Sequence, residues 1–327
     1  MTWLNGRLAA ALPAIEVDVT TNTAAVGRRQ VAPAEPAFLR HELAHAIYDE
    51  LHAGRTAPDV QPGRSLRDRG VEEQLADLLP HPELTRDLVP LAVRPDKVLV
   101  VLDGVRVWVP RRMVRAPDGV PRAGTPAAVR VPAARPALSP GFFYAEGGAA
   151  WRPAEPVFRV YVHLRTMPAA YAAWGRVLPM LADLGIGYRA KVVSSPDLLP
   201  RRDALVLYVA GRDRDPVPGG VAALTEAVRG IGAEVSAFAR PVAPGVAVAW
   251  DPADPRPAMR GLSFGEHRAA ALADGLIRHA ARRSDGDQSP LGATVRTALI
   301  EARIDPDEPS RNLPPSGPAW GGASVVS

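Results

Sequence analysis

"VFRVYVHLR", residues 157–165, alternates between apolar and polar side chains from Phe158 onward. Side chains of a β-strand point in turn to opposite faces, so the pattern predicts a strand with one apolar and one polar face. The polar face carries Arg159, Tyr161, His163 and Arg165. Two arginines, a tyrosine and a histidine suit the binding of an anion near a titratable group, and a solvated strand face is the alternative.

The segments around this strand predict an α/β (α+β) fold, because strands and helices follow one another along the chain. Downstream, hydrophobic periodicity predicts helices at 168–183, 219–230, 264–283 and 291–303, and strands at 187–194, 203–209, 233–239 and 246–250. Upstream, it predicts helices at 36–54 and 66–80, a hairpin at 97–109 with its turn at Asp103-Gly104, and a strand at 127–131.

A Pro/Gly-rich stretch at 132–156 predicts a domain boundary. We therefore expect an N-terminal helical and small β-rich module at 1–145, which docks a leader peptide or a kinase. A mixed α/β domain follows at 150–310. The last segment, 311–327, continues a Pro/Gly-rich tail that we expect to be flexible.

Composition narrows the class of protein. The chain has 327 residues, no cysteine and a net charge of +4, and no apolar run long enough to cross a membrane. The basic residues are not gathered into one run, so we expect neither nucleic acid nor a membrane as partner. We read the N-terminus as mature protein and expect a cytoplasmic location.

Lysine is scarce in this chain. Of 39 basic residues, only Lys97 and Lys191 are lysines. A buried lysine can lose its proton and act as a base, which arginine cannot do, so Lys191 is a candidate base beside Arg189 on the strand at 187–194. Further candidate anion ligands are Arg201 and Arg202 before the next strand, and Arg268 in the first turn of a capped helix.

His41-Glu42-Leu43-Ala44-His45 matches the H-E-x-x-H pattern of zinc proteases. On a helical wheel, however, His41, His45 and His52 lie opposite the apolar stripe, and no histidine stands where an extended motif needs a third ligand. Glu72 or Glu73 could serve only in principle. A surface helix face is the simpler interpretation, and a zinc metalloprotease is kept as an alternative function.

Several segments together resemble the HopA-like proteins, which are named after a type III secreted effector and also occur in peptide biosynthetic clusters. The resemblance spans residues 35–310 and is carried by "VLVVLDGVRVWVP", "ALSPGFFYAEG", "FRVYVHLR", "YRAKVVSSPDLLPRRDALVLYV" and "SFGEHR". Such proteins are related to the phosphothreonine lyases and are similar to the lyases of class V lanthipeptide and thioamitide pathways.

The resemblance implies a lyase that eliminates phosphate from phosphoserine or phosphothreonine of a precursor peptide, after a separate kinase has phosphorylated it. The products would be dehydroalanine and dehydrobutyrine, and neither metal nor other cofactor is needed. Carried over, His163 would be the acid, Lys191 the base with a lowered pKa, and Tyr208 a donor. The arginines would bind phosphate: Arg159, Arg165, Arg189, Arg201 or Arg202, and Arg268.

One position departs from the family pattern. The secreted lyases have a lysine two residues before the histidine, where this chain has Tyr161. Tyr161 or Tyr208 would then donate to the developing enolate oxygen. A non-catalytic phosphopeptide- or kinase-binding protein is the first alternative, and a secreted effector that acts on folded host proteins is another.

Overall fold

The computed structural model describes residues 4–55, 66–102, 104–136, 138–148 and 155–314. Its centre is a six-stranded antiparallel sheet in the order β10-β12-β13-β11-β15-β14. The strands are β10 (Phe142–Gly147), β11 (Val157–Leu164), β12 (Tyr188–Val193), β13 (Arg201–Ala210), β14 (Arg240–Ala243) and β15 (Val246–Trp250). The predicted mixed α+β class is confirmed.

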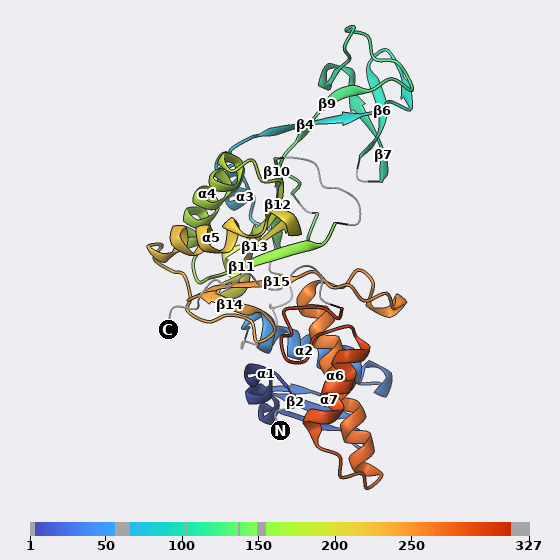
Figure 1. Cartoon of the computed structure of the whole chain (residues 1–327), viewed down its shortest axis with the longest axis vertical. Coiled ribbons are helices and arrows are strands. Elements are labelled where there is room, and N and C mark those ends of the chain that lie inside the picture. Colours follow the sequence, from blue (N-terminus) through green and yellow to red (C-terminus); the bar gives the residue numbers. More distant parts are fainter. Residues whose placement is uncertain (1–3, 56–65, 103, 137, 149–154, 315–327) are drawn as a thin grey trace.

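One face of the central sheet packs against helices α3 (Arg69–Asp77), α4 (Met167–Asp183) and α5 (Pro216–Glu226) (Figure 1). The apolar side chains of β11 point to this face, and Val160, Val162 and Leu164 are fully buried there. Trp174 of α4 anchors α3 by donating its indole N–H to the carbonyl of Leu75 at 3.0 Å. The alternation in residues 157–165 therefore predicted the packed face correctly.

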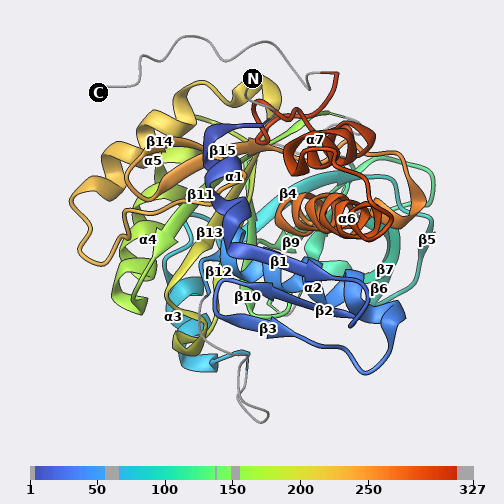
Figure 2. The ribbon, with the colours of Figure 1, turned by 90° about the horizontal axis from the view of Figure 1, so that it is seen from below.

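The opposite face of the sheet meets a lobe built from both ends of the described chain. Helices α1 (Gly6–Ala11), α2 (Leu39–Ile47), α6 (Phe264–Ser284) and α7 (Leu291–Glu301) share one hydrophobic core with the small sheet β1-β2-β3. Figure 2 shows α2 and α6 beside this sheet. The strands of the small sheet are β1 (Ile15–Asp18), β2 (Thr23–Val26) and β3 (Arg29–Val31).

A separate β-module with its own core projects from the central sheet (Figure 1). It contains two three-stranded sheets, β4-β9-β8 and β5-β6-β7. The strands are β4 (Glu83–Leu88), β5 (Ala92–Val93), β6 (Lys97–Leu102), β7 (Val105–Pro110), β8 (Val114–Arg115) and β9 (Ala127–Pro132). Leu102 pairs with Val105, which confirms the predicted two-residue hairpin connection; Gly104 has a φ of 81°, and Asp103 lies outside the described residues.

The expected domain boundary at 132–156 stays a prediction. The residues before it, however, do not pack as one module but contribute to different hydrophobic cores. Residues 4–55 share a core with α6 and α7, whereas residues 83–132 form the projecting module. Strand β10 lies inside the predicted boundary segment and forms an edge of the central sheet. Its backbone pairs with β12, although the Gly and Pro residues around it favour a loop.

One predicted strand is absent, and the described start of the tail is packed. No strand forms at 233–239, because the backbone there bonds to neighbouring segments: the amide of Ala237 donates to the carbonyl of Leu51 and that of Gly245 to the carbonyl of Ala233. The expected loose tail is packed as far as it is described. Asn312 donates to the carbonyl of Asp251, and the amide of Trp250 donates to the carbonyl of Ser310. Residues 315–327 lie outside the described residues.

Helix α2 continues into a π-helical turn, Tyr48–Ala53, and this turn alters the predicted helical wheel. Hydrogen bonds from residue i to i+5 widen the turn, so the positions that follow rotate away from an α-helical wheel. His52 was predicted on the solvated face but is 2% exposed. His41 and His45 precede the π-turn and are exposed, as predicted.

Candidate active site on the polar face of the central sheet

The predicted polar residues of three strands lie side by side on one face of the sheet. Directly opposed residues of antiparallel strands point to the same face. Arg159 of β11 pairs with Tyr208 of β13, and Tyr208 pairs with Arg189 of β12. In the next row, Val206 separates Tyr161 from Lys191. Lys191, Tyr161, Tyr208, Arg159 and Arg189 thus share a face, while their roles stay predictions.

The β11 end of this face is closed by the lobe of α2 and α6. Tyr161 packs edge-on against His52, with ring centroids 5.3 Å apart, and lies 5.8 Å from the ring of Phe264. Its hydroxyl is buried beside Arg159 without a well-aligned hydrogen bond. Burial raises the pKa of Tyr161, although the charge of Arg159 opposes this shift. Tyr161 is therefore a neutral donor at neutral pH.

Arg159 is held between a carboxylate and an aromatic ring. Its guanidinium forms an ion pair with Asp251 and lies 4.8 Å from the centroid of the Tyr208 ring. Burial opposes its charge, but Tyr161, Tyr208 and Asp251 together raise the pKa of Arg159. Arg159 therefore brings a fixed positive charge next to two phenol groups.

Lys191 lies at the more open end of the face. Its side chain is half-buried, and the Nζ atom lies 4.2 Å from the centroid of the Phe142 ring on β10. Among the described residues, no carboxylate forms an ion pair with Lys191. The Lys191 amine therefore lies on an aromatic ring, beside the arginine and tyrosine side chains of the same sheet face.

Arg201 faces the same site but is committed to a buried network. Its Nε lies 2.5 Å from Oδ1 of Asp203, and one Nη donates to the Tyr48 hydroxyl at 2.7 Å. Tyr48 in turn donates to Asp203 at 3.0 Å. The Asp203 carboxylate also lies 3.6 Å from Nε2 of His52, and Nδ1 of His52 is 2.8 Å from the Ser236 hydroxyl.

Burial and the charges of this network determine the protonation state of Asp203 and of His52. Burial alone would raise the pKa of Asp203, but the charge of Arg201 outweighs it and lowers the pKa. Burial lowers the pKa of His52 to about 4, so His52 is neutral at pH 7. Arg201 is thus neutralised by Asp203, and the pair orders the wall of the site.

His163 lies next to a β-bulge between Val162 and Leu164. Its Nδ1 is 3.0 Å from the carbonyl oxygen of Glu234. A carbonyl only accepts, so Nδ1 carries a proton and Nε2 is the nitrogen left for exchange. Burial lowers the pKa of His163, and the charges of Arg202 and Arg165 lower it further.

Lys191 and His163 lie on strands that are not adjacent in the sheet. The charged groups around His163 are Arg202, Glu234 and Arg165. Strand β13 lies between Lys191 and His163, so their backbones are separated by at least two strand spacings, about 10 Å. Lys191 must reach across β13 if both residues act on one substrate.

Arg202 belongs to the His163 side of the site. It donates to the carboxylate of Glu234 at 2.8 Å and to the carbonyl of Glu50 at 3.1 Å. Arg165 follows β11 and is exposed. The two consecutive arginines are therefore divided: Arg201 lies with the aromatic wall near Lys191, and Arg202 lies with His163.

The prediction that Arg268 binds phosphate is wrong. The residue is fully buried, and its guanidinium donates to the carbonyls of Pro309 at 3.0 Å and Arg311 at 3.1 Å, and to Asn312 at 2.8 Å. The remaining Nη lies 2.9 Å from Nδ1 of His267. Burial lowers the pKa of Arg268 to about 9, and the nearby charge of Arg159 acts in the same direction. Arg268 fastens the segment after α7 to α6.

The H-E-x-x-H segment has no metal-binding geometry. His41 and His45 project from α2 into solvent, and within the described ranges no three histidine, aspartate or glutamate side chains come together as a metal site. Glu72 instead forms an ion pair with Arg67. The zinc protease alternative gains no support from this part of the chain.

Sequence reasoning missed several residues of the site. Tyr48 and His52 come from the π-helical turn, Asp203 from the start of β13, and Phe142 from β10 inside the predicted boundary. The Arg201-x-Asp203 spacing is the one local signal, since two residues apart on a strand face the same side. The other three reach the site only through tertiary packing.

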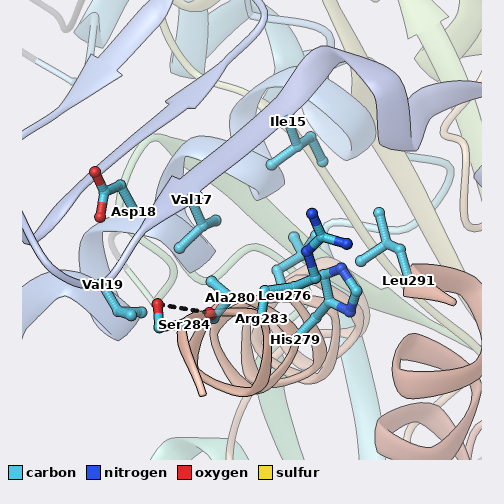
Figure 3. A pocket seen from close by; sticks show the side chains of 10 residues that line it. All are labelled: Ile15, Val17, Asp18, Val19, Leu276, His279, Ala280, Arg283, Ser284 and Leu291. Carbon is cyan, nitrogen blue, oxygen red and sulfur yellow. Dashed lines mark hydrogen bonds between the residues drawn. The ribbon is translucent and has the colours of Figure 1, made fainter. Parts of the chain in front are cut away.

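A cavity of about 420 Å³ lies elsewhere, between β1 and the helices α6 and α7 (Figure 3). Ile15, Val17 and Leu276 give it apolar walls, and His279 and Arg283 lie on the α6 side. None of the predicted site residues lines it. Separately, none of the helices in the described residues is both long enough and apolar enough to cross a membrane.

Comparison with known proteins places the chain in a family. Two solved structures are similar, both effector proteins of Pseudomonas syringae. The one from pv. tomato strain DC3000 has 15% identity and a TM-score of 0.47, covering 84% of this chain and 95% of its own. The one from pv. syringae strain 61 has 16% identity and a TM-score of 0.45, covering 84% and 92%. No curated protein matches. Residues 133–311, more than half of the chain, match the HopA1 effector protein family, and the chain therefore belongs to this family.

Proposed function

We propose that the chain is a carbon–oxygen lyase that eliminates phosphate from phosphoserine or phosphothreonine of a peptide. The observation that carries the proposal is Lys191, one of two lysines in the sequence. It lies without a carboxylate partner among the described residues, on a sheet face shared with Arg159, Arg189 and Tyr208. The arrangement supplies a candidate base beside two arginines, Arg159 paired with Asp251 and Arg189 paired with Glu146.

The reaction needs a base for the proton on Cα and a way to neutralise the departing phosphate. The neutral amine of Lys191 takes the Cα proton, the electron pair forms the Cα–Cβ double bond, and the Cβ–O bond breaks. The products are dehydroalanine or dehydrobutyrine and hydrogen phosphate. The neutral hydroxyl of Tyr161 or Tyr208 donates to the developing enolate oxygen, with Arg159 adding positive charge.

His163 is proposed as the acid that protonates the leaving oxygen through Nε2. Burial lowers the pKa of His163, and the charges of Arg202 and Arg165 lower it further, which disfavours the imidazolium. A bound phosphate dianion would offset these two charges and raise the pKa of His163. Arg165 and Arg202 are the proposed phosphate ligands, since their charges act on His163 and arginine binds phosphate oxygens with paired donors. Arg189 lies farther along the sheet, in the row of Arg159 and Tyr208, and forms an ion pair with Glu146. Arg201 orders the wall through Asp203.

The proposed substrate is a phosphorylated precursor peptide of the lanthipeptide type, supplied by a separate kinase in the cytoplasm. The family match reaches the HopA1 effector protein family and does not single out a peptide-maturation branch. A folded phosphoprotein is therefore the alternative substrate. The other alternative is a protein that binds phosphopeptide without chemistry, which the same sheet face would also allow.

The test is mass spectrometry of a phosphothreonine peptide and its phosphoserine counterpart after incubation with the protein, with a folded phosphoprotein as a parallel sample. Elimination removes phosphoric acid and leaves an alkene that adds a thiol, whereas hydrolysis leaves an alcohol that does not. We expect the thiol adduct. Tight binding with an unchanged substrate mass would establish the binding alternative instead.

A further inference from the structure

The sheet β5-β6-β7 of the projecting module buries one face and leaves the other without a partner. Val98 pairs with Val109 on the buried face. Leu99 pairs with Trp108, and Val101 pairs with Arg106, on the opposite side, which we term the outer face. Val101 is 40% exposed and Trp108 is 39% exposed. An exposed tryptophan in an apolar row is typical of an interaction surface.

The outer face is also cationic. The guanidinium carbon of Arg94 lies 4.9 Å, and Nζ of Lys97 lies 5.3 Å, from the centroid of the Trp108 ring. Arg106 lies on the same face. None of these three cations has an ion-pair partner among the described residues. The face therefore combines apolar area with uncompensated positive charge.

Among the described residues β7 pairs with β6 alone, so it forms an edge of its sheet. Leu102 and Val105 close a two-residue hairpin connection, so they form a hydrogen-bonded pair, and every second pair after them does too. The backbone N–H and C=O groups of Arg106 and Trp108 must then point to the free edge. Pro110 fits this pattern, since its missing N–H would also point outward.

We propose that the free edge of β7 and the outer face bind an extended acidic peptide, which adds to the sheet as a further strand. Its backbone would bond to Arg106 and Trp108. Its acidic side chains would lie beside the cations of the outer face. Its apolar side chains would lie on the other side, next to Val105, which is 62% exposed. A second copy of the chain fits worse, because it would bring the same cations to the edge.

The inference goes beyond the proposed lyase activity and does not depend on it, so the test uses an unphosphorylated probe. The probe is a fluorescein-labelled peptide of alternating glutamate and valine, and fluorescence anisotropy measures its binding to the full-length protein. We expect binding that weakens at high salt. Arg106→Glu should weaken it at least about tenfold and Trp108→Ala several-fold, because the first reverses a contact charge and the second removes the aromatic surface.

Three controls keep the proposal falsifiable. A lysine–valine peptide tests the charge, and a peptide with proline at alternate positions tests the backbone pairing, since proline cannot donate. Arg282→Glu, an exposed reversal on α6, should leave binding unchanged. The proposal is overturned if the lysine peptide binds equally well, if Arg106→Glu has no effect, or if sedimentation shows a dimer of the chain that Arg106→Glu dissociates.

Discussion

Asp203→Asn tests the buried network that orders the wall of the proposed active site. The Arg201 and Asp203 side chains are only 7% and 5% exposed, and the carboxylate also receives the Tyr48 hydroxyl. Removing one member of a buried ion pair costs about 3–5 kcal/mol, because the other charge stays buried without compensation. We therefore expect Asp203→Asn to lower the free energy of unfolding by about that amount at pH 7.

The pH dependence of this loss has a defined sign. The charge of Arg201 holds the pKa of Asp203 below its usual range in the folded protein. The carboxylate therefore stabilises the fold above its unfolded pKa, about 4, and the contribution is lost as pH falls through the lower folded pKa. The difference between wild type and Asp203→Asn should be constant near neutral pH and shrink only below about pH 4.

Urea denaturation followed by tryptophan fluorescence measures this free energy. The matched control is Glu301→Gln, which breaks the exposed pair between Arg278 and Glu301 on α6 and α7. Exposed pairs contribute about 0–1 kcal/mol, so the control should unfold nearly as the wild type does. A loss below about 1 kcal/mol for Asp203→Asn, or one equal to that of the control, would refute the network.

Three further variants probe other parts of the account. In Gly232→Ala, the new Cβ would lie 2.2 Å from Nδ1 of His163, so the imidazole ring must move. We expect the protein to fold and its rate of phosphate release to fall about a hundredfold. An unchanged rate would show that His163 takes no part in the reaction. Arg268→Met should release the segment after α7, seen as faster limited proteolysis there, and equal protection would contradict its structural role. The double variant His41→Ala/His45→Ala should leave the rate of phosphate release unchanged and should change the free energy of unfolding by no more than about 0.5 kcal/mol. If the wild type instead cleaves peptides in a chelator-sensitive way and the double variant does not, the protease alternative is favoured.

Alternation along 157–165 was sufficient to predict the central strand and the face on which Arg159 and Tyr161 lie. The same rule placed Arg189 and Lys191 together on their strand, and the register then brought both pairs to one face. This part of the site is predictable because strand periodicity fixes the direction of each side chain once the apolar face is packed.

The remainder depends on packing that no local pattern reports. The π-helical turn brings Tyr48 and His52 into the site, although an α-helical wheel places His52 in solvent. Arg268 lies near the start of a well-capped helix, yet the segment after α7 folds back over it and accepts hydrogen bonds from its guanidinium. Strand β10 is recognised as a strand only through its partner β12, since Pro and Gly residues surround it in the sequence.

The central claim is that Lys191 is the base that removes the Cα proton. The sequence offers a matched pair of variants, because its other lysine, Lys97, lies on the projecting module. Lys191→Arg and Lys97→Arg both keep the positive charge, but arginine does not deprotonate. The measurement is the rate of phosphate release from a phosphothreonine peptide by each variant. We expect release to be abolished in Lys191→Arg and retained in Lys97→Arg. Near-normal release by Lys191→Arg would show that Lys191 is not the base.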